Sequence, residues 1–262
     1  MIEIHEATVW RGSTRVFHRF SLTIDQHERV AVLGPNGSGK TTLLKTINRE
    51  LYPVVEDGAF IRLLGRERWN VWDLREHIGL VSQDLQSGFQ PNATVFEAIV
   101  SGFFSSIGVH YPLSDHIESD QLKKAEDVLG LLGLEDLRDR EFRTLSTGQQ
   151  RRALLGRALV HDPDTLILDE PTAGLDMTAS FDYLARIREL ARRGRSLVLV
   201  THHLDEIPPE IDRIIVLKGG RIVADGPKAS VLTEELLSEV YETDIRLVEV
   251  EGHYLACPGA PK

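Results

Sequence analysis

The stretch 29-RVAVLGPNGSGKTT-42 decides the fold of this chain. Its apolar, β-branched first part predicts a strand that ends at Gly34, and Leu43–Ile47 predicts an amphipathic helix. Between them the residues fit the pattern G-x-x-x-x-G-K-[ST]. A strand, a glycine-rich loop and a helix in this order form a cradle for phosphate groups. A simple glycine-rich turn is the alternative, and the complete motif in its required context argues against it.

The residues of this loop have separate roles in phosphate binding. Its glycines let consecutive backbone N–H groups turn toward the phosphates, where side chains would block them. The helix that follows directs its positive end to the same place. We expect Lys40 to contact the β- and γ-phosphates and the Thr41 hydroxyl to ligate Mg²⁺. The nucleotide-binding residues predicted in the loop are Gly34, Pro35, Asn36, Gly37, Ser38, Gly39, Lys40, Thr41 and Thr42.

The composition is that of a folded globular protein with an acidic surface. The 262 residues are 42% hydrophobic and 27% charged, with a net charge of −10. This charge argues against binding of nucleic acid through neutralised phosphates. Cys257 is the only cysteine, so a reducing compartment fits. No segment approaches the ~20 apolar residues that span a bilayer, and no signal-peptide pattern is present, so we expect a cytoplasmic protein.

The predicted elements change in kind along the chain. Strands at 2–10, 20–25, 30–33, 59–64 and 78–82 are interrupted by the helix from Lys40. Helices follow at 94–104, 118–132 and 146–161, and strands return at 165–168 and 196–201 with a helix between them. We therefore predict an α/β protein, a P-loop NTPase core with an N-terminal antiparallel β part. A single domain, 1–262, would consist of a core (1–86 and 163–262) and an inserted helical subdomain (87–162).

Two adjacent acidic residues follow a second buried strand. The apolar run Thr165–Leu168 delivers Asp169 and Glu170 to the carboxyl-terminal edge of the predicted sheet, where ligands of α/β proteins bind. Asp169 can hold Mg²⁺ directly or through water. Glu170, which we expect on the opposite side of the strand, can orient or deprotonate an attacking water. A solvated strand end is the alternative.

The segment Leu145–Gln149 permits two interpretations. Ser146 and Gln149 form an S-x-x-Q capping box, which any helix can carry at its start. The same helix start can offer the Ser146 hydroxyl and a backbone N–H group to a phosphate. Capping alone does not decide between the two.

The order of these motifs resembles that of the ATP-binding cassette (ABC) ATPases, and the resemblance covers nearly the whole chain. It rests on the phosphate loop, on Leu145–Gln149, on Leu168–Glu170, and on two further segments, Ala173–Asp176 and Thr201–His202. Gln83 also falls at a family position. The resemblance implies that ATP and Mg²⁺ are the ligands.

The resemblance assigns roles to single residues. Trp10 would stack on the adenine, Gln83 would sense the γ-phosphate and Mg²⁺, and Glu170 would be the catalytic carboxylate. His202 would contact the γ-phosphate. Each has a structural alternative: Trp10 can be an exposed strand aromatic, and His202 can be a hydrogen-bonded residue at a strand end.

The family signature would close over ATP that a second copy holds. Its residues here are Leu145, Ser146, Thr147, Gly148 and Gln149. Asp176 would communicate across this dimer, and it can also cap the helix that follows. Thr147 stands where the family usually has glycine, which can alter the approach of the backbone to phosphate. His203 stands where aspartate is common, and we assign it no role.

ATP hydrolysis by such a cassette could drive one of three processes: membrane transport, DNA repair or translation. A soluble DNA-repair ATPase should carry a long heptad-bearing insertion, and a translation factor should carry two cassettes. This chain has neither, and its acidic charge argues against both. A membrane transporter subunit therefore remains as the main interpretation, and a soluble ABC-type ATPase as the alternative.

The expected partners follow from the transporter interpretation. They are a second copy or a paralogous cassette, joined head to tail, and integral membrane subunits on the inner face of the cell membrane. No nucleic acid is expected. A cassette without a fused membrane domain resembles prokaryotic importers, and the segment 232–256 resembles the tail of cassettes that serve metal, metal-chelate or molybdate-type importers. That tail can also be an edge hairpin unrelated to the cargo.

Overall fold

The computed structural model describes residues 1–82, 85, 88–89, 92–106 and 117–259. The chain forms two compact units. The first unit contains Met1–Val71 and Ser196–Lys262, and the second contains Trp72–Arg195. Within the described ranges, no helix combines the length and the apolar character needed to cross a membrane. The domain boundaries expected from the sequence remain a prediction.

The main sheet of the first unit carries the phosphate loop. Its strands lie in the order β7-β3-β8-β9. Their bounds are Ser196–Thr201 (β7), Arg29–Leu33 (β3), Arg213–Lys218 (β8) and Arg221–Pro227 (β9). β3 is parallel to both β7 and β8, and its residues from Val30 to Leu33 are completely buried. Continuous apolar runs are typical of such central parallel strands, and the predicted strands 30–33 and 196–201 are confirmed.

A three-stranded antiparallel sheet forms the N-terminal part of the first unit. It contains β1 (Ile2–Arg11), β2 (Thr14–Ile24) and β4 (Phe60–Leu63) in the order β2-β1-β4. β2 begins at Thr14 rather than at the predicted Phe20, because Phe17 is also a core residue. The rings of Phe17 and Phe20 stack with centroids 4.3 Å apart. Phe17 also packs over Gly39, directly before α1 (Lys40–Ile47).

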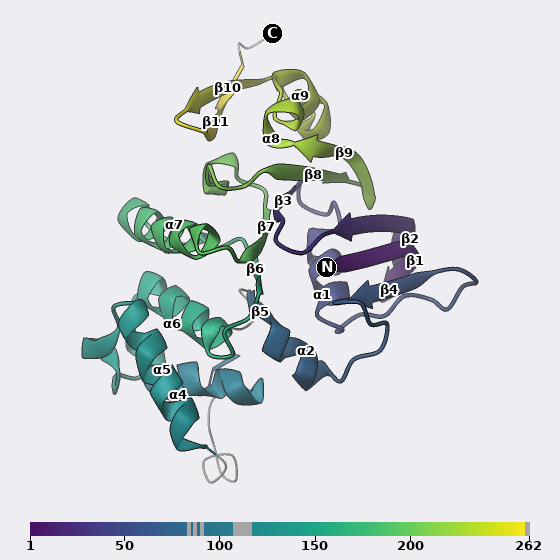
Figure 1. Ribbon diagram of the computed structural model, residues 1–262. Coiled ribbons are helices and arrows are strands. Elements are labelled where there is room, and N and C mark those ends of the chain that lie inside the picture. Colours follow the sequence, from purple (N-terminus) through teal and green to yellow (C-terminus); the bar gives the residue numbers. More distant parts are fainter. Residues whose placement is uncertain (83–84, 86–87, 90–91, 107–116, 260–262) are drawn as a thin grey trace. The chain divides into compact units, whose positions relative to one another are not determined.

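The C-terminal part of the first unit is fastened to β8. It consists of α8 (Lys228–Val231), α9 (Glu234–Tyr241), β10 (Ile245–Val250) and β11 (His253–Pro258) (Figure 1). Thr233 caps α9 by accepting a hydrogen bond from the Leu236 N–H group. At the other end of α9, the Lys218 Nζ donates to the Glu239 carbonyl oxygen at 2.9 Å and pairs with Glu242 at 2.9 Å. The last turn of α9 is therefore held against the end of β8.

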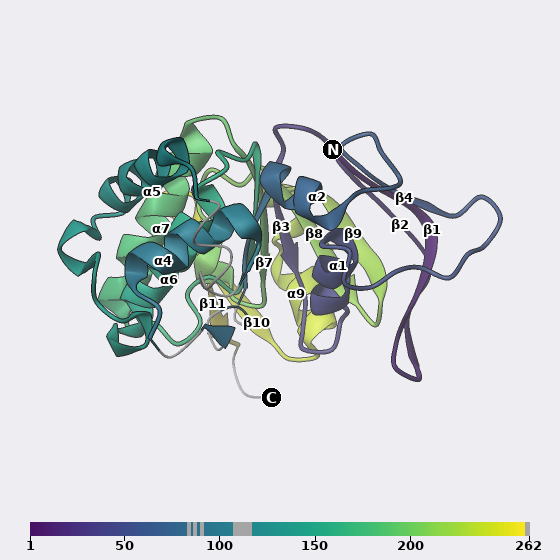
Figure 2. The same ribbon diagram turned by 90° about the horizontal axis from the view of Figure 1, so that it is seen from below.

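The second unit combines two parallel strands with helices. β5 (Ile78–Val81) pairs with β6 (Thr165–Asp169). Among the helices, α4 packs on α5 and α6, and α6 also packs on α5 and α7 (Figure 2). These helices span Val95–Val100 (α4), Ser119–Leu131 (α5), Thr147–Leu159 (α6) and Met177–Arg192 (α7). The 3-10 helix η1 (Ser101–Phe104) extends α4. The inserted helices predicted from the sequence are confirmed.

One of the helices that were not predicted is α2 (Val71–His77). It is short, and only Leu74 of its residues is buried. A helix with a single buried side chain has no apolar stripe, so hydrophobic periodicity could not reveal it.

A capping box opens α4. The Thr94 side chain accepts a hydrogen bond from the Glu97 N–H group at 3.1 Å, and the Glu97 side chain accepts one from the Thr94 N–H group at 2.8 Å. Two helix donors are thereby satisfied.

We expect Thr94→Ala to lower the free energy of unfolding by about 1 kcal/mol. The substitution removes the hydroxyl that accepts the hydrogen bond from the Glu97 N–H group. Urea denaturation followed by circular dichroism measures this loss. Thr178→Ala, an exposed position in the first turn of α7, is the control and should stay within about 0.5 kcal/mol of the wild type. Equal effects of the two substitutions would contradict the role of the cap.

Candidate functional site

The phosphate loop is a closed turn between β3 and α1. Gly37 and Gly39 have φ of +79° and +111°, a region that favours glycine. The Ser38 N–H group donates to the Pro35 carbonyl oxygen at 3.2 Å, and the Gly220 N–H group donates to the Ser38 carbonyl oxygen at 3.0 Å. The loop is therefore bonded both to itself and to the turn that joins β8 and β9.

Gly220 is a supporting residue that the sequence interpretation missed. A Cβ atom at Gly220 would lie 1.9 Å from the Val16 carbonyl oxygen, so no other residue fits there without movement. The pair Gly219-Gly220 has the local pattern of a turn between two strands. Its second glycine also allows the backbone of β2 to approach the loop, a requirement that no local pattern encodes.

Gly34 is enclosed by β8. A Cβ atom at Gly34 would lie 2.2 Å from the Leu217 carbonyl oxygen. Since this neighbour is backbone rather than a flexible side chain, it cannot move away without disturbing β8. The first glycine of the motif is thus required by close packing.

The side chains of the loop provide a donor set that fits a polyphosphate. Lys40 is 7% exposed, and its Nζ donates to the carbonyl oxygens of Gly34 at 2.6 Å and Pro35 at 3.1 Å. The Ser38 Oγ is buried and has no hydrogen-bond partner in the described part of the chain. A buried hydroxyl without a partner is unfavourable unless a ligand supplies one. An ammonium group, a hydroxyl and glycine N–H groups together suit an anion.

The predicted Mg²⁺ ligands are not brought together in one unit. Thr41 is exposed at the start of α1 in the first unit, and Asp169 ends β6 in the second. Gln83 lies outside the described residues. Among the described residues, no group of three or more histidine, cysteine, aspartate or glutamate side chains forms a metal site. The Mg²⁺ assignments therefore remain predictions.

His202 lies at the same sheet edge as the phosphate loop. Thr201, the last residue of β7, is the register partner of Leu33, the last residue of β3. The residues that follow, His202 and Gly34, therefore leave neighbouring parallel strands at their carboxyl ends. His202 is half-buried and His203 is exposed, with ring centroids 3.9 Å apart. The structure thus brings His202 close to the loop, as its predicted contact with the γ-phosphate requires.

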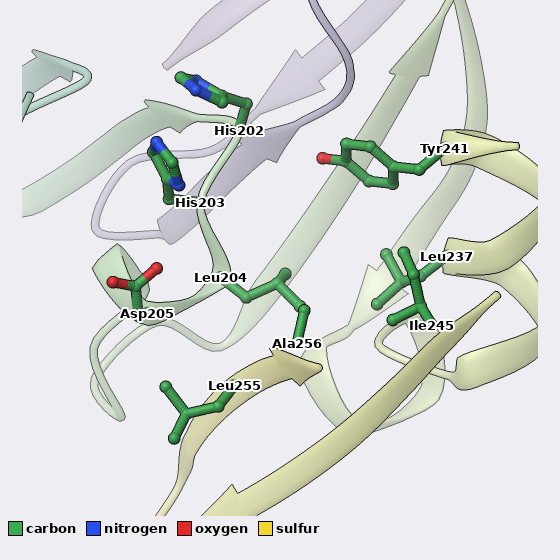
Figure 3. A pocket seen from close by; sticks show the side chains of 9 residues that line it. All are labelled: His202, His203, Leu204, Asp205, Leu237, Tyr241, Ile245, Leu255 and Ala256. Carbon is green, nitrogen blue, oxygen red and sulfur yellow. The ribbon is translucent and has the colours of Figure 1, made fainter. Parts of the chain in front are cut away.

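A cavity of about 430 Å³ lies beside the two histidines (Figure 3). α9 and β11 form its opposite wall, and Tyr241 directs its hydroxyl toward the histidine side. Burial raises the pKa of Tyr241 to about 12, and the backbone of Gly34 at the phenol oxygen opposes this shift. The residues that line the cavity are His202, His203, Leu204, Asp205, Leu237, Tyr241, Ile245, Leu255 and Ala256. The C-terminal helix, to which the sequence interpretation gave no role in the site, therefore lines a cavity beside His202.

Trp10 presents an exposed ring in the first unit. It lies near the end of β1, opposite Arg15, and 44% of its surface is exposed. An exposed indole can stack on a base. Its contact with adenine remains a prediction.

The acidic pair of the second unit has an unusual backbone. Asp169 is the last residue of β6, and Leu168 pairs with Val81 of β5. Glu170 has φ of +45°, a left-handed conformation that costs a residue with a side chain roughly 1–2 kcal/mol. β6 ends at Asp169, so Glu170 lies outside the strand and its expected place on the opposite side of the strand stays a prediction. Strain of this kind is typical of functional sites.

The signature segment lies against the start of α7. Ser146 accepts a hydrogen bond from the Gln149 N–H group at 3.3 Å, so the capping box is confirmed. A Cβ atom at Gly148 would lie 2.9 Å from the Ala179 Cβ, and Asp176 caps α7 by accepting from the Ala179 N–H group at 2.8 Å. The second unit therefore brings the signature and Asp176 together. Leu145 is buried beneath them, and binding of phosphate by Ser146 remains a prediction.

Thr147 does not crowd this surface. Its side chain is exposed, and its Cγ2 lies 4.0 Å from the place where a Cβ at Gly174 would stand. The position of the usual signature glycine thus faces the loop that leads to Asp176.

We expect Gly34→Ala to weaken ATP binding by about tenfold or more, because the new methyl group would overlap the Leu217 carbonyl oxygen. Isothermal titration calorimetry measures the affinity. Gly65→Ala is the matched control: it has φ of +80° and no atom within 4 Å of its Cβ, so it carries backbone strain without crowding. An unchanged affinity of Gly34→Ala would contradict the close packing.

Two sequence relatives give the context of the site. The chain is 35% identical to the cobalt import ATP-binding protein CbiO of Rhodobacter capsulatus, over 85% of this chain and 77% of the relative. It is 29% identical to the hemin import ATP-binding protein HmuV of Bradyrhizobium diazoefficiens, over 96% of this chain and 92% of the relative.

Two solved structures share the fold. CbiO1 of Clostridium perfringens, part of the transporter complex CbiONQ, has a TM-score of 0.72 and 28% identity, covering 91% of this chain and 92% of that one. The dimeric bacterial cassette MJ0796 has a TM-score of 0.70 and 25% identity, covering 87% and 98%. The family model described as ABC transporter matches residues 17–173. The chain therefore belongs to the ABC transporter family and is one of its ATP-hydrolysing cassettes.

Proposed function

We propose that this cassette hydrolyses Mg-ATP to power the import of a metal or a metal chelate through membrane subunits. The observation that carries the proposal is the phosphate loop, in which buried Lys40 and the unpartnered Ser38 hydroxyl lie next to the strand that delivers His202.

ATP binding is assigned to the first unit. Lys40 would exchange its carbonyl partners for the β- and γ-phosphates, and the loop N–H groups would bind the remaining oxygens. Trp10 would stack on the adenine. Thr41, Gln83 and Asp169 would hold Mg²⁺, which neutralises charge on the phosphates when it is bound.

Hydrolysis is assigned to Glu170 and His202. Glu170 would accept a proton from the attacking water, whose oxygen forms a bond to the γ-phosphorus as the bond to the bridging oxygen breaks. His202 would donate a hydrogen bond to the γ-phosphate, where negative charge changes during the reaction. The position of Glu170 directly after the carboxyl end of β6 supports an assignment to chemistry, because ligands of α/β proteins bind at this edge of the sheet.

A complete site would require two copies. Ser146, Gly148 and Gln149 would close over ATP held by the loop of a second copy or of a paralogous cassette, with Asp176 beside them. The exposed helix start formed by these residues supports this assignment, since a helix N-terminus suits phosphate.

The direction of transport and the class of cargo are inferred from relatives. A cobalt import ATP-binding protein and a hemin import ATP-binding protein both align along most of this chain. Together with the C-terminal segment α9–β11, they support import of a metal or metal chelate, whereas an oxyanion such as molybdate has only the tail resemblance in its favour. The cassette would then act at the inner face of the cell membrane through its membrane subunits.

We expect Glu170→Gln to bind ATP, to lower hydrolysis by about a hundredfold or more, and to accumulate as a dimer with two trapped nucleotides. The amide keeps the size of the side chain but cannot accept the proton. Light scattering with and without Mg-ATP measures the molecular mass. The same mass in both conditions would contradict the proposed assembly.

The control for assembly is the double variant Glu170→Gln/Ser146→Arg. The arginine places bulk at the proposed phosphate contact and should abolish the dimer while ATP still binds to the monomer. A double variant that still dimerises would mean that Ser146 only caps α6.

We expect His202→Ala to lower turnover by about a hundredfold while ATP affinity stays within about twofold, since its proposed contact matters to the reacting phosphate. His203→Ala is the matched control and should be close to neutral, because His203 is exposed and no contact with phosphate is proposed for it. A larger loss of turnover in His203→Ala than in His202→Ala would contradict the assignment of the γ-phosphate contact to His202.

A further inference from the structure

The turn that carries His202 contains two buried polar side chains that the proposed reaction does not use. Thr201 is 0% exposed and Glu206 is 1% exposed. Between them in the sequence lie His202, which is half-buried, and His203, which is exposed. Burying a carboxyl group is costly unless hydrogen bonds compensate. A buried glutamate next to a catalytic segment therefore requires an explanation.

The Thr201 hydroxyl connects the two sides of this turn. Its oxygen accepts a hydrogen bond from the His203 N–H group at 2.9 Å. Its proton is donated to the Glu206 Oε2. The 3-10 helix η5 (Leu204–Glu206) is closed by the Ile207 N–H group, which donates to the Leu204 carbonyl oxygen at 3.0 Å.

These bonds fix His202 from both neighbours in the chain. On one side, Thr201 is paired in β7 with Leu33 of β3. On the other side, the backbone of His203 is bonded to the Thr201 side chain. His202 is the single residue between these two anchors, so the direction of its side chain depends on them.

We propose that Thr201 and Glu206 are positioning residues that aim His202 at the γ-phosphate. The proposal rests on the proposed function of His202 and adds a device to it: Glu206 orients the Thr201 hydroxyl as a donor, which leaves the hydroxyl oxygen to accept the His203 N–H group. Without Glu206 the hydroxyl can rotate, and without the hydroxyl the His203 N–H group loses its acceptor. In both cases His202 is less well aligned, and misalignment of a catalytic group by about 1 Å can cost up to about a hundredfold in rate.

The test compares Thr201→Val with Thr201→Ser. Valine keeps the shape of threonine and removes the hydroxyl, whereas serine keeps the hydroxyl. We expect Thr201→Val to lower kcat by about tenfold or more with the Kd for ATP within about twofold, and Thr201→Ser to restore kcat to within about threefold of the wild type. Steady-state phosphate release gives kcat, and isothermal titration calorimetry gives the Kd.

Glu206→Leu provides a second variant that does not alter β7. It removes the acceptor of the Thr201 hydroxyl, and kcat should fall in the same direction with ATP affinity preserved. Asp205→Asn is the matched control on the same 3-10 turn, because Asp205 is exposed, and its kcat should be unchanged. Thermal melting of each variant shows whether it is folded at the assay temperature.

The outcomes separate this proposal from the proposed function. If His202→Ala loses turnover while Thr201→Val and Glu206→Leu retain wild-type kcat, the positioning role is wrong and the role of His202 stands. If His202→Ala retains turnover, both are wrong. If Thr201→Ser fails to restore kcat, or if ATP affinity falls in parallel with kcat, Thr201 has only a structural role.

Discussion

The parallel pairing of β3 with both of its neighbours is the constraint on which the first unit depends. Leu33 lies opposite Thr201 on one side and Val216 on the other, so β3 and β7 end at the same level while β8 continues to Lys218. This register brings the phosphate loop and the turn that carries His202 close to each other. A slip of one residue would turn every side chain of a strand to the opposite face. Because β3 is paired along both of its edges, such a slip would also break its pairing with β7 and β8 at the same time.

Close backbone approaches then make the loop stiff. Gly34 lies against the Leu217 carbonyl oxygen of β8, and Gly39 lies against the Phe17 ring of β2, so these two strands enclose the loop. Lys218, one residue beyond Leu217, ties the last turn of α9 to the same strand. The nucleotide site is therefore supported from behind by segments far apart in the sequence, and its glycines serve packing as much as phosphate access.

The sequence predicted what local chemistry determines. The phosphate loop, the capping boxes at Thr94 and Ser146 and the buried strands of the sheet each have a pattern that is complete within a few residues. What it did not predict depends on tertiary contacts: the supporting role of Gly220, the approach of Tyr241 to Gly34, and the short helix α2 with one buried side chain. The end of β6 before Glu170 belongs to the same group, because a single left-handed residue leaves no periodic signal.

The left-handed backbone of Glu170 links the conformational stability of this protein to its rate of ATP hydrolysis. A left-handed glutamate is less favourable than glycine or asparagine at the same position, and the difference is carried by every folded molecule whether or not it holds ATP. Selection for thermal resistance alone would therefore replace this residue with glycine and lose the carboxyl group. A glutamate at this position would therefore lower the free energy of unfolding while it provides the carboxyl group needed for turnover.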